Sequence, residues 1–199
     1  MGEKPSWVRL GEAITAHARP ATYPLAIKFV EKGGEVPEKA REPLARMPIC
    51  RAMNISRRFG WFLRLTKRSV FCPGMLLLGL VDYDEETWKN FTQQLSKEFV
   101  APFMGISADA SIKTMEKLAK LPPGSVEAML VQPLERAAFE PDLVVVYGNP
   151  AQVNKLVTSV LWALGDEAVI RPRVSFGFDA CHSLAEAHKS GDPQVNFQG

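Results

Sequence analysis

The chain has 199 residues, of which 46% are hydrophobic and 23% charged, and its formal net charge is +2. These values are typical of a globular protein with a proper core, so we expect a single domain over residues 1–199 with a truncated or irregular tail over 190–199. Three cysteines, an odd number, argue against the disulfide framework of a secreted protein. The N-terminus lacks the apolar core of a signal peptide, and no apolar stretch approaches the roughly 20 residues that cross a bilayer. We therefore expect a cytoplasmic protein that does not enter a membrane.

The first third of the chain predicts a helix, a strand and a second helix. One stripe of apolar and aromatic residues recurs at helical spacing, formed by Trp7, Leu10, Ile14 and His17. It predicts a helix over residues 5–18 with His17 as a core histidine. The β-branched run that follows predicts a strand over 24–30. Pro48 in a first turn and Gly60 at an end then frame the second helix.

The remainder continues to alternate between helical and extended patterns. Further helices are predicted over residues 73–80, 84–99, 107–121, 149–165 and 178–191, and strands over 61–66, 127–134 and 142–148. The valine run in the last of these strands is typical of a strand buried on both sheet faces. Because strands and helices alternate, we expect an α/β or α+β fold, a single compact domain with a mixed sheet and flanking helices.

Positive charge is concentrated in one segment, residues 41–68. Its eight basic residues face a single acidic one, Glu42; they are Arg41, Arg46, Arg51, Arg57, Arg58, Arg64, Lys67 and Arg68. Such an excess favours an anionic partner, which could be a phosphate, a carboxylate, a nucleic acid or an acidic protein. We select Arg51, Arg57 and Arg58 as candidates for charge complementarity, the alternative being an ordinary solvated helix face.

A second anion-binding candidate is the turn "VVVYGNPAQ", where a predicted strand leads into a predicted helix. Asn149 is a suitable cap, and the backbone N–H groups of Ala151 and Gln152 would point toward an anion at the helix N-terminus. Ligands of open α/β sheets often bind at such turns. Every strand–helix turn offers similar donors, so the signal has low specificity.

The three cysteines, Cys50, Cys72 and Cys181, all lie at or near predicted helix N-termini, where a thiolate is stabilised. If folding gathers them, they could ligate an iron–sulfur cluster with one open site, or a zinc ion with water in the fourth position. The alternative is that each is a small buried core residue. No dinucleotide-binding, Walker, zincin, Cys-x-x-Cys or nucleophile-elbow motif occurs, so the sequence assigns no catalytic residues and leaves enzymatic activity undecided.

Several stretches resemble the domain of unknown function 169 family of archaea and bacteria. They are "RPATYPLAIKFV", "MPICRAMNISRRFG", "VFCPGMLLLGL", "PDLVVVYGNPAQ" and "FDACHSLAEAHKSGDPQVNF", and they cover most of the chain from about Tyr23. The resemblance implies a compact cytoplasmic protein without an assigned reaction, and it matches Cys50, Cys72 and Cys181 to cysteines of the family pattern. That pattern continues with another cysteine and a G-x-R element, whereas this chain ends at "QG".

Three functional hypotheses follow. The first is a metal or iron–sulfur site formed by the three cysteines beside the basic segment. The alternative is a module that binds a small anionic ligand or a partner, with structural cysteines. The third is nucleic-acid binding through the basic segment, with Phe59, Trp61 and Phe62 as stacking surfaces. We favour it least, because the overall charge is near neutral and these aromatic residues are expected in the core.

Overall fold

The computed structural model describes residues 4–98, 107–165, 171–173 and 178–196. The chain forms two compact units, and each is assembled from two separate stretches of sequence. The first unit comprises residues 1–71 and 127–169, and the second comprises residues 72–126 and 170–199. The α/β fold class is confirmed, while the single domain over 1–199 stays a prediction.

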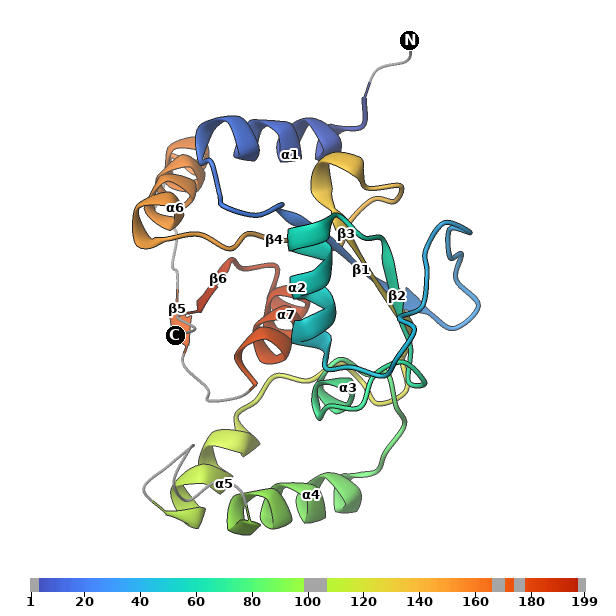
Figure 1. The fold of residues 1–199 in the computed structure, drawn as a ribbon. Helices are drawn as coiled ribbons and strands as arrows, with labels where there is room; N and C mark the ends of the chain where they lie inside the picture. The colour runs from blue at the N-terminus through green and yellow to red at the C-terminus, as the bar shows by residue number, and fades with distance from the viewer. Residues whose placement is uncertain (1–3, 99–106, 166–170, 174–177, 197–199) are drawn as a thin grey trace. The chain divides into compact units, whose positions relative to one another are not determined.

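The first unit contains a four-stranded antiparallel sheet with the strand order β2-β3-β1-β4 (Figure 1). The strands are β1 (Leu25–Glu31), β2 (Leu63–Leu65), β3 (Val126–Pro133) and β4 (Leu143–Val145). In the register of the two outer pairs, Leu63 lies opposite Val131 and Leu25 lies opposite Val145. All four strands lie within or next to the predicted extended runs.

The valine run of β4 differs from its prediction. Instead of lying inside the sheet, β4 is an edge strand that pairs with β1 alone. Leu143 and Val145 are half-buried, and Val144 is exposed. The expectation of burial on both faces is wrong because an edge strand this short is covered only in part.

The described part of the first unit also contains the helices α1 (Ser6–His17), α2 (Ile49–Phe59) and α6 (Pro150–Leu164) and the 3-10 turn η1 (Leu134–Arg136). α2 begins after Pro48 and ends at Gly60, whose left-handed conformation (φ 76°) stops the helix as predicted. Its buried side faces β1 and β2 and consists of Ile49, Ala52, Met53 and Ser56.

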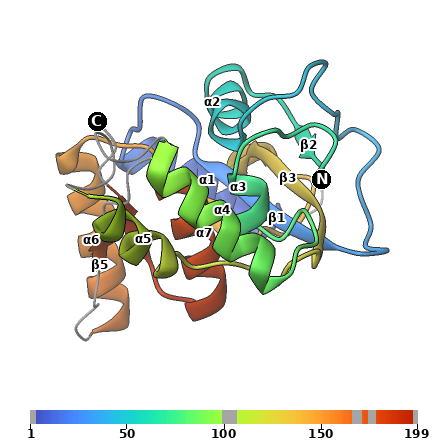
Figure 2. The same ribbon diagram turned by 90° about the horizontal axis from the view of Figure 1, so that it is seen from below.

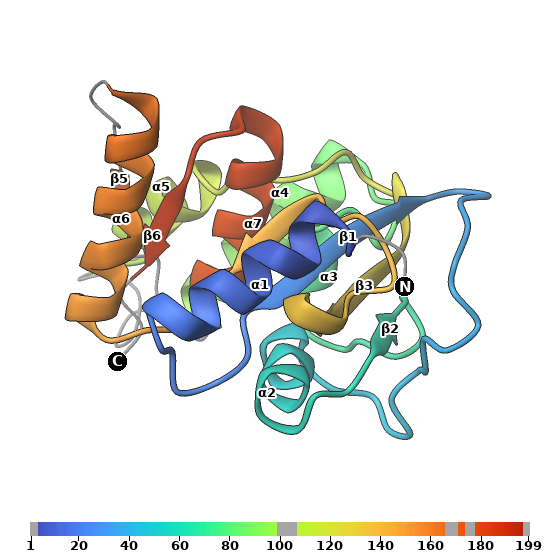
Figure 3. The ribbon, with the colours of Figure 1, turned by 90° about the horizontal axis from the view of Figure 1, so that it is seen from above.

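Helix α1 contacts η1 and lies over the sheet (Figure 3). Its buried side is centred on Gly11, the one fully buried residue of the helix, with Trp7 and Ile14 packed beside it against the core. Leu10 and His17 lie at the edge of this face and are exposed, so the prediction of a core histidine is wrong. Fewer residues of the predicted apolar stripe are buried than their spacing indicates, because the helix meets η1 at Gly11 and not along the whole stripe.

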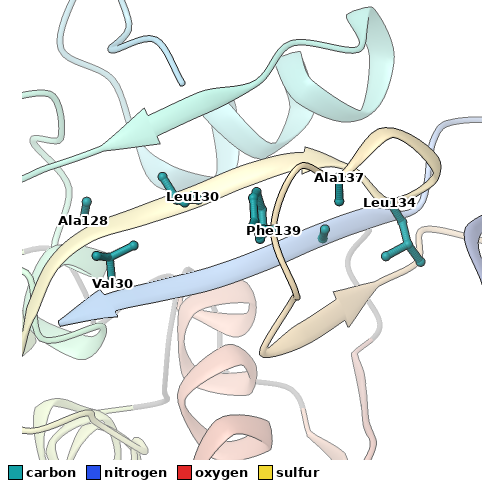
Figure 4. Packing of buried hydrophobic residues seen from close by; sticks show 7 residues of the cluster. Val30, Ala128, Leu130, Leu134, Ala137 and Phe139 are labelled. Atoms are coloured by element: carbon teal, nitrogen blue, oxygen red, sulfur yellow. The ribbon is translucent and has the colours of Figure 1, made fainter. Parts of the chain in front are cut away.

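A hydrophobic cluster joins β1, β3 and the residues after β3 (Figure 4). Its members are Ala26, Val30, Ala128, Leu130, Leu134, Ala137 and Phe139. The ring of Phe62 packs against that of Phe139, with ring centroids 5.6 Å apart. Burial of these side chains stabilises this unit, at about 25 cal/mol per Å² of apolar surface removed from water.

The second unit contains α3 (Gly74–Leu77), α4 (Glu85–Glu98), α5 (Ala108–Glu116), α7 (Asp179–Ser190) and the parallel pair β5 (Arg171–Arg173) and β6 (Gln194–Asn196). α4 and α5 lie side by side (Figure 2), and α7 contacts α3 and β6. β6 occurs within the stretch predicted as an irregular tail. Among the described residues, no helix has the length and apolar character needed to cross a membrane.

Candidate functional site

The N-terminus of α6 is closed by a reciprocal cap. Asn149 Oδ1 accepts the backbone N–H of Gln152 at 2.9 Å, and the backbone N–H of Asn149 donates to Gln152 Oε1 at 2.9 Å. Gly148 makes room for this arrangement, since a Cβ there would lie 3.1 Å from Cβ of Gln152. The backbone N–H of Gln152, which was predicted to point toward an anion, is therefore already used by the cap. The backbone N–H of Ala151, the other predicted donor, makes no hydrogen bond within the described chain.

The same end of α6 is tied to the turn between α1 and β1. Gln152 Nε2 donates to the carbonyl of Arg19, a residue with a left-handed backbone (φ 51°). This conformation is unfavourable for a residue with a side chain, by about 1 kcal/mol or more, unless its surroundings hold it. The bond to Gln152 is one contact that does so.

Arg57, in the last turn of α2, contacts both the α1–β1 turn and the segment that leads into α6. Its guanidinium carbon lies 4.1 Å from the ring centroid of Tyr147, two residues before the cap Asn149. Its Nη1 donates to Thr22 Oγ1 at 3.3 Å, and its backbone carbonyl accepts the N–H of Tyr23 at 3.0 Å. The structure thus brings together the basic segment and the strand–helix turn, which were predicted separately.

The charge of Arg57 has no carboxylate partner among the described residues. Its side chain is half-buried, and its Nε is buried without a hydrogen-bond acceptor. Arg64 offers a comparison, because its Nε is also buried without an acceptor but its Nη2 donates to the carboxylate of Glu42 at 2.8 Å. A cation withdrawn from water is normally paired, so Arg57 is an exception among the half-buried cations that the structure describes in this unit.

The other two candidate arginines lie elsewhere on α2. Arg51 is exposed on the side opposite the buried residues, and Arg58 is exposed with its Nε donating to Asn54 Oδ1 at 2.9 Å. Neither contacts the α6 segment through a hydrogen bond or ion pair of the described chain. Of the three arginines selected from the sequence, Arg57 alone is shown in contact with the predicted strand–helix turn.

A second arginine–tyrosine pair adjoins the first and was missed by sequence reasoning. Arg136, in η1, lies 5.0 Å from the ring centroid of Tyr23 and donates to its hydroxyl at 3.1 Å. The guanidinium also approaches the end of α2, since a Cβ at Gly60 would lie 3.4 Å from Arg136 Nη1. No local pattern indicates this pairing, because the two partners are 113 residues apart.

Two of the aromatic residues expected in the core lie on the surface. Phe59 is 69% exposed and Trp61 is 54% exposed, whereas Phe62 packs against the core cluster as expected. The expectation is wrong for the first two because α2 ends at Gly60. The residues on both sides of that turn lie beyond the helix face that packs on the sheet.

The three cysteines differ in burial and in location. Cys50, in the first unit, is exposed; Cys72 and Cys181, in the second, are half-buried and buried respectively. No group of three or more histidine, cysteine, aspartate or glutamate side chains within the described ranges is arranged to hold a metal ion. The structure gives the predicted cysteine-ligated zinc or iron–sulfur centre no support, and that centre stays a prediction.

Comparison with known protein families gives a match over most of the chain. A family model described as DUF169, an uncharacterised ArCR family, matches residues 13–199. The chain belongs to the DUF169 family. The resemblance noted from the sequence motifs is thereby confirmed. Comparison with curated proteins found no significant match, and comparison with solved structures found none either.

Proposed function

We propose that this DUF169 protein binds a small anionic ligand, through a phosphate or carboxylate group, where Arg57 meets the segment leading into α6. The observation that carries the proposal is the half-buried guanidinium of Arg57, which has no carboxylate partner in the described chain. An anion would supply the missing acceptor. Charge-assisted hydrogen bonds of this kind are about twice as strong as neutral ones.

The surroundings of Arg57 support the same chemistry. Tyr147 and Thr22 hold the guanidinium in one orientation, so little side-chain entropy is lost when a ligand binds. The 15-residue helix α6 directs its positive dipole end and the N–H of Ala151 toward the same segment. The first unit also carries 16 of the 24 lysine and arginine residues of the chain against 12 acidic ones.

The proposal is tested by titrating the isotopically labelled full chain with inorganic phosphate and, separately, with acetate, and following backbone amide resonances. We expect saturable shifts at Ala151, Tyr147 and Tyr23. Arg57→Gln should weaken the affinity by about tenfold or more, the loss expected for one hydrogen bond to a charged group. Arg57→Lys should recover only part of it, because lysine lacks the planar guanidinium that stacks on Tyr147.

Arg51→Gln is the matched control. It removes the same charge from the same helix but from the exposed outer side, so the affinity should stay within about twofold of the wild-type value. An equal loss of affinity in Arg51→Gln and Arg57→Gln would mean that the anion is attracted only by the overall positive charge of α2. That result, or an absence of saturable shifts near Ala151, would refute the proposal.

A further inference from the structure

The end of α2 presents two large aromatic rings to solvent. Phe59, the last residue of the helix, and Trp61, the second residue after it, are 69% and 54% exposed. Single exposed apolar residues are common on protein surfaces. Two aromatic rings on either side of one turn need a more specific explanation, because their burial in a core would have been favourable by about 2 kcal/mol each.

The turn that carries the rings is fixed by hydrogen bonds. The backbone N–H of Gly60 donates to the carbonyl of Ser56 at 2.9 Å, and Ser56 Oγ, which is fully buried, donates to the carbonyl of Trp61 at 2.7 Å. Gly60 itself adopts the left-handed conformation that this turn requires. The rings are therefore mounted on a preorganised backbone, which lowers the entropic cost of binding a partner.

Two cationic side chains lie near the same turn. Arg58 precedes Phe59 in the chain, and a Cβ at Gly60 would lie 3.4 Å from Nη1 of Arg136. Arg136 Nε also forms an ion pair with Glu135 at 3.6 Å, but the arginine side chain is 57% exposed and can reach a ligand. We refer to Arg58, Phe59, Trp61 and Arg136 as the α2 C-terminal surface. Cations at a helix C-terminus also stabilise the helix dipole, but that role does not require exposed aromatic rings.

We infer that the α2 C-terminal surface binds single-stranded nucleic acid, with bases stacked on Phe59 and Trp61 and phosphates paired with Arg58 and Arg136. Exposed aromatic rings interleaved with basic side chains are the combination that such ligands require. A duplex keeps its bases stacked internally and offers them no exposed face. An acidic peptide would pair with the arginines but would leave both rings without a matching surface.

The near-neutral charge of the whole chain does not oppose this inference. The excess of positive charge belongs to the first unit, where residues 41–68 hold eight basic residues and one acidic residue. That acidic residue, Glu42, is paired with Arg64. Arg51 lies on the outward side of α2 two turns before Arg58, about 10 Å away, and extends the cationic surface along the helix.

The inference is tested by fluorescence anisotropy of a labelled oligothymidylate of about 12 nucleotides with the full chain at low salt. Phe59→Ala and Trp61→Ala should each weaken the affinity by about tenfold, the typical loss for one stacked base. Trp61→Phe, which keeps a ring, should retain most of the binding. Trp162→Ala is the matched control, because Trp162 is 87% exposed on α6 of the same unit, and it should leave the affinity unchanged.

The charged residues are tested by the dependence of affinity on salt. Arg58→Gln and Arg136→Gln should each lower the slope of log Kd against log salt by about 0.7, the value for one phosphate contact on a single strand. Lys155→Gln, on the exposed side of α6, should not change it. The circular dichroism spectrum of each variant should match that of the wild type, because the four side chains of the α2 C-terminal surface are exposed.

Three results would overturn the inference. The first is an absence of saturable oligonucleotide binding, and the second is affinity that is unaffected when both rings are removed. The third is equal affinity for a duplex of the same sequence or for a polyglutamate peptide, which would make the surface a general anion or acidic-protein site. Because none of these variants includes Arg57, the outcome is independent of the small-anion proposal.

Discussion

His182 Nδ1 accepts the backbone N–H of Ala119 at 2.7 Å, and both groups are buried. The bond joins α7 to the segment that follows α5 across 63 residues of sequence. Because Nδ1 is the acceptor, the ring carries its proton on Nε2 in this arrangement. The histidine therefore acts as a structural anchor within the second unit.

Removal of the Nδ1 acceptor should destabilise the protein. His182→Phe keeps most of the volume but leaves the buried N–H of Ala119 without a partner, which should lower the free energy of unfolding by about 1–3 kcal/mol. His182→Asn places an amide oxygen near the position of Nδ1 and should recover part of the loss. Urea unfolding followed by circular dichroism measures both values. Equal stability of His182→Phe and the wild type would mean that Ala119 does not depend on this acceptor.

Gly11→Ala should also destabilise the protein, although helix propensity alone predicts the opposite. Alanine is favoured over glycine inside a helix by about 1 kcal/mol. However, a Cβ at position 11 would lie 2.7 Å from the backbone nitrogen of Glu135 and 3.1 Å from the carbonyl carbon of Leu134. Backbone atoms cannot rotate away, so α1 must separate from η1, and overpacking of this kind costs about 1–3 kcal/mol.

The control for this substitution is Ala13→Gly, on the exposed side of the same helix. It should cost about 1 kcal/mol, as propensity alone predicts. Both variants can be compared by thermal unfolding at one protein concentration. A stabilised Gly11→Ala variant would show that α1 can move away from η1 without loss.

The stability of the protein should depend on Tyr83 at alkaline pH. Burial raises the pKa of Tyr83 above its ordinary value of 10.0, and its hydroxyl donates to the carbonyl of Leu76 at 3.3 Å. The folded state therefore holds this proton more tightly than the unfolded chain. Its contribution to stability is complete below pH 10 and is lost as the pH rises through the raised pKa.

The raised pKa of Tyr83 can be checked by two measurements. Tyrosinate absorbance should show a component that titrates above 10 and is absent in Tyr83→Phe. The free energy of unfolding should fall less steeply above pH 10 in Tyr83→Phe than in the wild type. Identical alkaline profiles for the two proteins would contradict the assignment to Tyr83.

Local signals predicted most of the secondary structure. The helix between Pro48 and Gly60 and the helix between Asn149 and Gly165 both end where their caps indicated, because a cap is decided by neighbouring residues. The short strands β5 and β6 were missed. β5 has three residues with a central proline, and its partner lies more than twenty residues away, so no local pattern indicates the pairing.

Burial and the candidate site were less predictable. The concentration of positive charge in residues 41–68 pointed to Arg57 as a candidate, but it did not distinguish Arg57 from its neighbour Arg58. The distinction depends on which residue meets Tyr147, and that contact is tertiary. In the same way, glycine has a low helix propensity, so the sequence gives Gly11 no special role. The contact with η1 nevertheless makes Gly11 the centre of the buried face of α1.

The reactivity of the three thiols should follow their exposure. Under native conditions Cys50 should react with a thiol reagent at once, Cys72 more slowly, and Cys181, 7% exposed, only on the timescale of unfolding. Cys50→Ser should remove the fast phase alone, and denaturant should make the remaining two thiols react together. Adding a stoichiometric amount of zinc tests the predicted cysteine centre, and an unchanged reaction rate of Cys50 would give that centre no support. If zinc instead protected all three thiols at once and was retained after dialysis, the three cysteines would have to form a common centre.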